Sequence, residues 1–294
     1  MCSSDLWRGR NARWPPRPIR FPPAPHGFVM RKSLVKAKLR RREPCLGVAL
    51  HLTDPTVYEL ASLVGFDYIW MDLEHHATSV ETAWSLMRAA RVGQADIMAR
   101  PAKGEFMRLG RLLEAGAHGI LYPRCESAEE AREVVRWSKF GPLGTRGFDG
   151  GNPDMPYCRA DFAEYIREAN EETWIVIQIE SPQALERVDE IAAVEGVDVI
   201  MLGPADFSIL AGIPGQFQHP RIDEALRKIA AAADRHGKAW GTTAGTPERV
   251  RELIERGALW TTCGCDLIWV KNGLEQARRE MEKLGVRFAT PSQP

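Results

Sequence analysis

From Leu46 onward the chain alternates short apolar runs with longer amphipathic runs, and this alternation limits its possible folds more than any other feature. The short runs, such as Trp174–Ile179, hold few polar residues, as expected of strands that are buried on both faces. Eight such strands, each followed by a helix, predict an α/β fold, a closed (β/α)8 or TIM barrel. A doubly wound open sheet is the alternative. It is disfavoured because the glycine fingerprint of dinucleotide-binding sheets is missing after the first strand.

The predicted strands are Leu46–Leu50, Asp67–Asp72, Ala95–Ala99, Gly119–Tyr122, Trp174–Ile179, Val197–Leu202, Lys238–Thr242 and Leu259–Thr262. The predicted helices are Pro55–Val64, Val80–Val92, Glu105–Ala115, Ala128–Lys139, Pro182–Ala192, Arg221–His236, Pro247–Arg256 and Asp266–Leu284. Three of these helices begin with a capping residue followed by proline, and glycine follows several of their ends. The segment 141–170 begins rich in glycine and proline and becomes helical, so we expect it to cover one end of the barrel.

Residues 1–29 do not fit this pattern. They are rich in proline and arginine, show no periodicity, and contain no continuous apolar stretch like that of a signal peptide. We expect this tail to be disordered or an artefact of the gene model, with the natural start at Met30. Residues 30–294 then form the barrel domain.

The charge balance excludes several classes of partner. Lys and Arg together number 39, as do Asp and Glu, so no net field favours nucleic acid or an anionic membrane. No apolar run approaches the roughly 20 residues that span a bilayer. The six cysteines are scattered through a large chain, which favours a reduced, cytoplasmic setting. We interpret Cys263 and Cys265 as buried thiols, because Cys-Gly-Cys is too short for a typical zinc hook.

Polar side chains gather where the predicted strands end, which in such a barrel is where reactions occur. Glu180 and Asp206 end adjacent strands. Two carboxylates facing one axis repel each other unless a hard divalent cation neutralises them. Each residue alone could instead cap the helix that follows it.

Arg100 and His75 are the other candidates from the residues alone. Arg100 ends an apolar strand and would either hold an anionic oxygen or pair with Asp72 or Glu74. His75 could be a general base, a metal ligand or a hydrogen-bonded loop residue. His118, His219 and His236 are better explained as packing or surface residues, and His51 and His76 stay undecided.

Six motifs recur in an order and at intervals that resemble one family. They are Gly65–His75 (GFDYIWMDLEH), Ala99–Pro101 (ARP), Glu114–Ala117 (EAGA), Gly144–Gly147 (GTRG), Gln178–Glu180 (QIE) and Gly203–Ser208 (GPADFS). Together they resemble the HpcH/HpaI aldolases, class II pyruvate aldolases of the 2,4-dihydroxyhept-2-enedioate and 2-keto-3-deoxy-sugar-acid type. The likeness runs from about Gly47 to Leu284 and implies a barrel of the phosphoenolpyruvate/pyruvate type.

The resemblance implies a divalent cation, Mg, Mn or Co. Its ligands would be Glu180 and Asp206, and the acidic residues Asp72 and Glu74 would hold its bound waters. The implied reaction is reversible aldol cleavage of a 4-hydroxy-2-oxo acid to pyruvate and an aldehyde, by a carbon–carbon lyase. Relatives exchange the eighth helix between subunits, which implies a homo-oligomer, a hexamer built as a trimer of dimers.

The resemblance also assigns the substrate contacts. Arg100 would face the keto oxygen of pyruvate, and the backbone N–H groups of Gly203 and Ala205 would receive its carboxylate. His75 would be the acid/base residue for the aldol hydroxyl, paired with Glu114. In relatives this partner is often an aspartate. Because Glu114 precedes the fourth strand, at the opposite end of the barrel, either a neighbouring subunit supplies it or the pair does not form in this protein.

The sequence departs from the relatives at two further positions. Ala49 stands where several of them carry tryptophan, which implies a roomier pocket for the aldehyde, and Leu73 replaces a glycine. Two other functions remain open. One is a malyl- or citramalyl-CoA-type lyase, for which Arg124 and Arg146 are the only hints of a basic docking surface. The other is a catalytically silent barrel that binds a keto acid.

Overall fold

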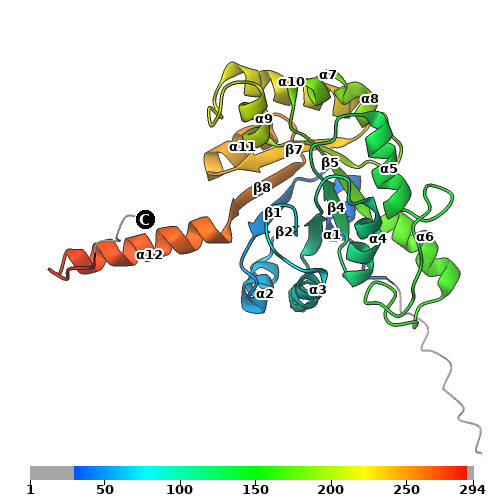
Figure 1. The fold of residues 1–294 in the computed structure, drawn as a ribbon, viewed down its shortest axis with the longest axis horizontal. Coiled ribbons are helices and arrows are strands. Elements are labelled where there is room, and N and C mark those ends of the chain that lie inside the picture. The colour runs from blue at the N-terminus through cyan, green and yellow to red at the C-terminus, as the bar shows by residue number, and fades with distance from the viewer. Residues whose placement is uncertain (1–29, 290–294) are drawn as a thin grey trace, which may run out of the picture.

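A computed structural model describes residues 30–289, and the interpretation of residues 1–29 falls outside this range. Eight parallel strands close into a barrel in the order of the sequence, as predicted (Figure 1). The strands are β1 (Cys45–Leu50), β2 (Tyr68–Asp72), β3 (Asp96–Arg100), β4 (Gly119–Tyr122), β5 (Trp174–Ile179), β6 (Val199–Leu202), β7 (Ala239–Ala244) and β8 (Trp260–Cys265).

Helices surround the barrel close to their predicted positions. They are α2 (Pro55–Val64), α3 (Val80–Ala89), η1 (Ala90–Val92), α4 (Phe106–Ala115), α5 (Ala128–Ser138), α6 (Phe162–Glu172), α10 (Pro220–Arg235), α11 (Pro247–Glu255) and α12 (Asp266–Glu282). The predicted helix Pro182–Ala192 is divided at Arg187 into α7 (Pro182–Glu186) and α8 (Val188–Ala192). Helix α1 (Leu34–Arg40) was not predicted, and α9 (Pro204–Leu210) was expected only as a short helical turn after Asp206.

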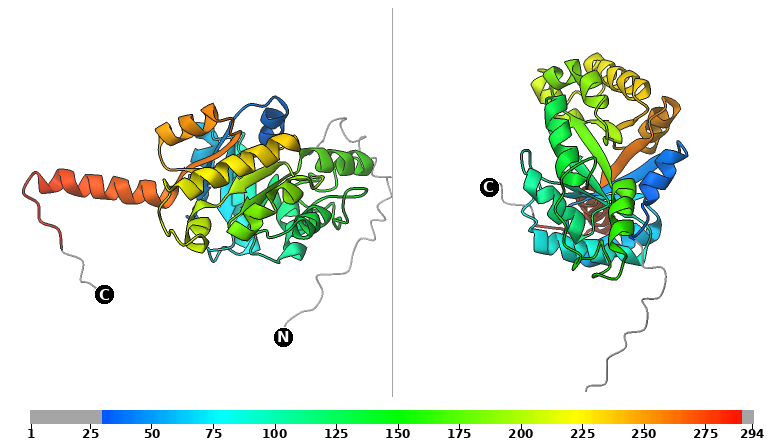
Figure 2. Two further views of the ribbon diagram at one scale, coloured as in Figure 1. Left: turned by 90° about the horizontal axis from the view of Figure 1, so that it is seen from above. Right: turned by 90° about the vertical axis from the view of Figure 1, so that its right-hand side faces the viewer.

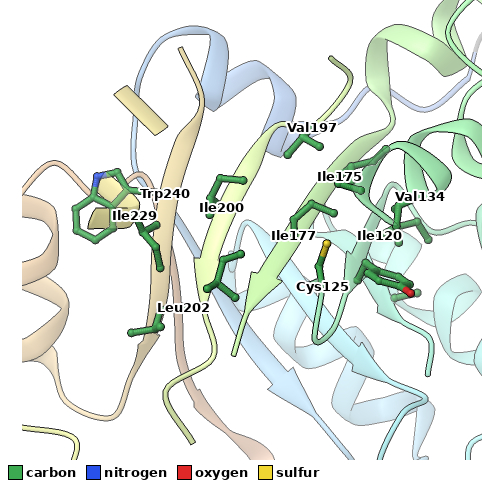
Figure 3. Packing of buried hydrophobic residues seen from close by; sticks show 14 of the residues in the cluster. Ile120, Cys125, Val134, Ile175, Ile177, Val197, Ile200, Leu202, Ile229 and Trp240 are labelled. Carbon is green, nitrogen blue, oxygen red and sulfur yellow. The ribbon is translucent and has the colours of Figure 1, made fainter. Parts of the chain in front are cut away.

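The core has an outer and an inner layer. Alternate strand residues such as Ile177 and Ile200 point outward and pack against helix residues such as Val134 and Ile229 (Figure 3). This layer is the largest apolar cluster of the described residues, and at about 25 cal/mol per Å2 of buried apolar area its burial is a major source of stability.

Aromatic side chains fill the barrel interior. Tyr68 stacks on Trp260 with ring centroids 3.8 Å apart, and Trp174 meets Trp260 edge-on at 5.0 Å. Glycine makes room for these rings, because a Cβ at Gly47 would lie 2.2 Å from Tyr68 and one at Gly119 would lie 2.3 Å from Trp174. Side chains therefore fill the barrel interior, and the polar groups that bind a substrate are confined to the rim where the strands end.

Strand β8 extends three residues beyond its predicted end. Gly264 has a φ of 85°, and the register between β1 and β8 shifts between Gly47 and Ala49. This irregularity turns Cys265 toward the barrel mouth. Cys263 and Cys265 are both partly exposed, so the prediction of buried thiols was wrong.

Helix α12 does not cover the barrel but projects away from it (Figures 1 and 2). Its apolar side chains are exposed, among them Ile268 (54%) and Leu274 (67%). Beside its first turn a groove of about 600 Å3 is lined in part by Phe66, Val250 and Trp269.

Among the described residues, no helix is long and apolar enough to cross a membrane.

Candidate active site

The centre of the site is an ion pair between neighbouring strands. Arg100, the last residue of β3, donates from Nε and Nη2 to the two oxygens of Asp72 at the end of β2, at 2.9 and 2.7 Å. The guanidinium also lies 4.7 Å from the centre of the Trp70 ring. Burial works against ionisation of Asp72, but the bonds and charge of Arg100 hold its pKa below the ordinary value. Asp72 is therefore ionised, and it fixes the guanidinium plane.

Glu74 and His75 follow this pair on the loop after β2. Glu74 Oε2 lies 3.3 Å from Arg100 Nη1 and 3.6 Å from His75 Nε2. The same oxygen is buried without a hydrogen-bond partner among the described residues, and burial raises the pKa of Glu74. His75 extends into solvent, so its ring can reach a molecule bound above the ion pair.

Glu180 ends β5 and is buried (3% exposed). Its oxygens accept hydrogen bonds from Gln178 Nε2 at 2.9 Å and from the Arg124 backbone N–H at 2.8 Å. Burial, opposed by the Arg124 N–H and reinforced by the charge of Asp206, raises the pKa of Glu180 to about 7. Helix α7 is capped instead by Ser181, so the alternative of Glu180 as a helix cap was wrong.

Asp206 lies in the first turn of α9, after the end of β6. Gly203 is the N-cap of this helix, so Asp206 is not its cap residue. The charge of Asp206 contributes to the raised pKa values of both Glu74 and Glu180, so the three carboxylates act on one another electrostatically. Gly203 leaves room for Glu180, because a Cβ there would lie 2.3 Å from Glu180 Oε1.

These residues fit a bound divalent cation. Glu180 is a buried carboxylate whose ionised form lacks a cationic partner within the hydrogen-bond and ion-pair contacts of the described residues, and the buried Glu74 Oε2 has an unused lone pair. Oxygen donors on adjacent strand ends are what Mg2+ or Mn2+ binds. A cation would lower the cost of keeping Glu74, Glu180 and Asp206 ionised together.

The structure corrects one expected substrate contact. The Gly203 N–H donates to the Ile179 carbonyl at 2.9 Å as part of the ladder between β5 and β6, so it is not free to receive a carboxylate. Pro204 has no N–H. The Ala205 N–H lies at the second position of α9, where an amide has no acceptor in its own helix. Of the two predicted donors, only Ala205 can fill this role in this conformation.

Glu114 lies apart from His75, as its position in the sequence implied. It occupies the last turn of α4, which runs back toward the amino ends of the strands. Burial raises the pKa of Glu114, with smaller effects from Arg146, Asp154 and Asp149 in the segment after α5. The carboxylate beside His75 is Glu74 instead. Within one chain Glu114 and His75 therefore form no pair.

Two histidines left undecided by the sequence lie at the same rim. His51 follows β1, and its ring lies 4.3 Å from that of His76. His51 also contacts Asp266, the first residue of α12, at 3.3 Å. A histidine at the end of a strand was the only sequence signal for this cluster. His118 is buried, whereas His219 caps α10 and His236 contacts Asp189, in agreement with their predicted structural roles.

The family model described as HpcH/HpaI aldolase/citrate lyase matches residues 46–272, which span all eight strands. The chain belongs to this family. The resemblance inferred from the six motifs is thereby confirmed, and with it the barrel fold and the class of carbon–carbon lyases.

Curated members of the HpcH/HpaI family align over most of their length. The hydroxypyruvate/pyruvate aldolase of Delftia acidovorans is 34% identical over 79% of this chain and 86% of its own. The 4-hydroxy-2-oxo-heptane-1,7-dioate aldolase of Escherichia coli is 31% identical over 86% of this chain and 94% of its own.

Solved structures give the same family. An HpcH/HpaI aldolase from Desulfitobacterium hafniense has a TM-score of 0.80 and 31% identity, covering 88% of this chain and 98% of that one. The citrate lyase beta subunit from Mycobacterium tuberculosis has a TM-score of 0.51 and 18% identity over 76% and 92%, a likeness of fold alone.

Proposed function

We propose that this protein catalyses reversible aldol cleavage of a 4-hydroxy-2-oxo acid to pyruvate and an aldehyde. The observation that carries the proposal is the fixed Arg100 guanidinium, which lies at the barrel rim together with Glu180 and Asp206. A guanidinium beside a set of carboxylates that fits a cation suits a 2-oxo acid, whose carboxylate and keto oxygens carry the negative charge. Curated relatives that align with nearly the whole barrel are named pyruvate or oxo-acid aldolases.

Glu180 and Asp206 would hold the divalent cation, and Asp72 and Glu74 would orient its waters. When bound, Mg2+, Mn2+ or Co2+ supplies Lewis-acid stabilisation of negative charge on the C2 oxygen. Gln178 and the Arg124 N–H orient Glu180 through its two oxygens. Such outer hydrogen bonds keep a ligand in position.

Arg100 would donate to the keto oxygen. A guanidinium has five N–H groups. The contacts with Asp72 and Glu74 use three of them, one on each nitrogen. Two N–H groups remain for the substrate, in a plane that Asp72 already fixes. Because the donor is placed before the charge develops, little reorganisation opposes the reaction. The Ala205 N–H would receive the carboxylate.

His75 would remove the proton from the C4 hydroxyl as the C3–C4 bond breaks, which leaves the aldehyde and the enolate of pyruvate. The enolate then takes up a proton at C3 to give pyruvate, and in the reverse direction His75 returns its proton to the C4 oxygen. Its exposed ring next to Glu74 leaves it free to meet the aldehyde end of the substrate. Glu114 of a neighbouring subunit would orient this ring, since Glu114 of the same chain lies elsewhere.

Oligomerisation would complete the site. The exposed apolar residues of α12 and the apolar groove beside its first turn are complementary surfaces of one chain. Exchange of α12 between two copies would cover both, and we propose a homo-oligomer, a hexamer built as a trimer of dimers.

The five cysteines among the described residues are free, which supports a reducing, cytoplasmic setting.

A pyruvate-coupled assay tests the function. The wild-type protein with Mn2+ should release pyruvate from 4-hydroxy-2-oxo acids, and Arg100→Lys should do so at least about 100-fold more slowly. Malyl-CoA is the comparison substrate, because Arg124 and Arg146 were the two hints of a basic surface that could bind coenzyme A. Arg146 is buried in an ion pair with Asp154 at 2.6 Å, so it does not contribute to such a surface. Turnover of malyl-CoA without turnover of any 4-hydroxy-2-oxo acid would contradict the proposal, as would binding of 2-oxo acids with no turnover.

A further inference from the structure

A second group of metal-ligating side chains lies where β1 and β8 end. His51, Cys265 and Asp266 each present one ligand atom, and these three atoms lie within 4.8 Å of one another. None of them contacts Glu180 or Asp206 in the hydrogen bonds and ion pairs of the described residues. The donors are an imidazole nitrogen, a sulfur and a carboxylate oxygen, whereas those of the candidate active site are oxygens alone.

The fold brings the three residues together by an irregular strand end. The positive φ of Gly264 and the shifted register against Ala49 direct Cys265 toward His51. Asp266 begins α12, and its oxygens accept hydrogen bonds from the backbone N–H groups of His51 and Leu52 at 2.9 to 3.0 Å. The carboxylate is thus fixed beside the end of β1 before any ligand arrives.

One ring nitrogen of His51 lacks a hydrogen bond in this arrangement. Its Nδ1 lies 3.3 Å from Asp266 Oδ1, yet it is buried and has no hydrogen-bond partner of acceptable geometry among the described residues. The ring of His76 lies 4.3 Å away at a tilt of 37°, and its nitrogen falls within 4.8 Å of ligand atoms of His51 and Asp72. The two groups of ligand atoms share His51 and are otherwise separate.

We propose that His51, Cys265 and Asp266 form a second cation site, selective for a borderline ion such as Zn2+. Sulfur and imidazole donors prefer Zn2+ over Mg2+, and the site therefore differs in selectivity from the oxygen-lined one. Donor atoms around a tetrahedral zinc lie roughly 3.3 to 3.8 Å apart, so the cluster needs only a small contraction to close.

The position of the site indicates its effect. Asp266 and Cys265 are the residues at which α12 leaves the barrel, and His51 belongs to the loop between β1 and α2. A bound ion would join these two segments and fix the direction in which α12 projects. With α12 exchanged between subunits as proposed above, Zn2+ would stabilise the assembled protein.

Cobalt absorption spectroscopy on the full-length protein tests this inference. Co2+ bound by a thiolate gives a sulfur-to-metal charge-transfer band in the near ultraviolet, which oxygen ligands cannot give. Wild-type protein titrated with Co2+ should develop this band. The band should be lost in Cys265→Ser and retained in Cys263→Ser, a matched control because that thiol contacts only the Thr261 carbonyl among its hydrogen bonds.

Zinc binding gives a second readout. The affinity for Zn2+ should fall at least about 100-fold in Cys265→Ser and in His51→Ala, beyond the usual effect of a residue that merely orients a ligand. Circular dichroism checks that each variant is folded. The charge-transfer band should also persist in Glu180→Gln, which separates this site from the proposed catalytic one. Absence of the band in wild type, its persistence in Cys265→Ser, or its loss in Glu180→Gln would overturn the inference.

Discussion

Replacing Glu180 with glutamine should stabilise the metal-free protein at alkaline pH. The pKa of Glu180 is raised from 4.5 to about 7, mainly by burial. A group whose pKa is raised on folding contributes stability below its unfolded value and loses it as the pH rises through the folded value. Wild-type protein should therefore lose stability from about pH 5 to pH 7, as the buried carboxylate becomes ionised.

The magnitude follows from the two pKa values. One pKa unit corresponds to about 1.4 kcal/mol, so ionised Glu180 costs the folded state about 3 kcal/mol by pH 8. Glutamine avoids this cost. It cannot, however, accept from both Gln178 Nε2 and the Arg124 N–H, and one lost hydrogen bond costs about 1 kcal/mol. We expect Glu180→Gln to be about 2 kcal/mol more stable than wild type at pH 8. At pH 5 the two should be nearly equal, because ionisation of the unfolded carboxyl already costs wild type about 1 kcal/mol there.

Urea unfolding in the presence of chelator measures both values, with the exposed Glu186→Gln as the control that should change neither. Saturating Mn2+ should reverse the order at pH 8, because only the wild-type carboxylate binds the cation as a charged ligand. A difference between wild type and Glu180→Gln that is the same at pH 5 and pH 8 would refute the reasoning.

Three further predictions concern other parts of the site. Gly203→Ala should reduce kcat/KM at least about 100-fold in steady-state assays, because its Cβ would displace Glu180, whereas Gly110→Ala, whose Cβ would make only an ordinary 3.8 Å contact with Arg146, should leave activity unchanged. Arg100→Lys should lose a similar factor, since a lysine cannot hold Asp72 with a planar fork and also reach the keto oxygen; activity within tenfold of wild type would contradict this role. Ile268→Asp should yield smaller particles in light scattering while Lys271→Asp should not, because Ile268 belongs to the exposed apolar surface of α12; an unchanged mass would count against helix exchange.

Much of the fold was accessible from the sequence because the barrel depends on a repeated local pattern. Buried strands are continuously apolar, and capped helix starts such as Asp54-Pro55 mark where each outer helix begins. The division at Arg187 was not predictable, since both halves share one apolar face. Helix α1 is only seven residues long and packs under the barrel through Val35, so its periodicity is too short to recognise.

The candidate site was predictable where a residue's role depends on its position at a strand end. The residues at strand ends are Arg100, Asp72 and Glu180, and their side chains lie at one rim of the barrel, as predicted. The donor role of Gly203 could not be judged in advance, because its N–H is taken by a ladder bond to a neighbouring strand. The exposure of Cys265 depends on the irregular end of β8, which leaves no trace in the periodicity.

The most direct test of the central claim is the rate of pyruvate release from a 4-hydroxy-2-oxo acid before and after metal removal. Excess chelator should abolish activity, and added Mg2+, Mn2+ or Co2+ should restore it in the wild type but not in Glu180→Gln. An aldolase that uses a lysine would instead form a Schiff base with pyruvate, which borohydride traps. Full activity in excess chelator, together with a borohydride-trapped pyruvate adduct on any lysine, would contradict the account.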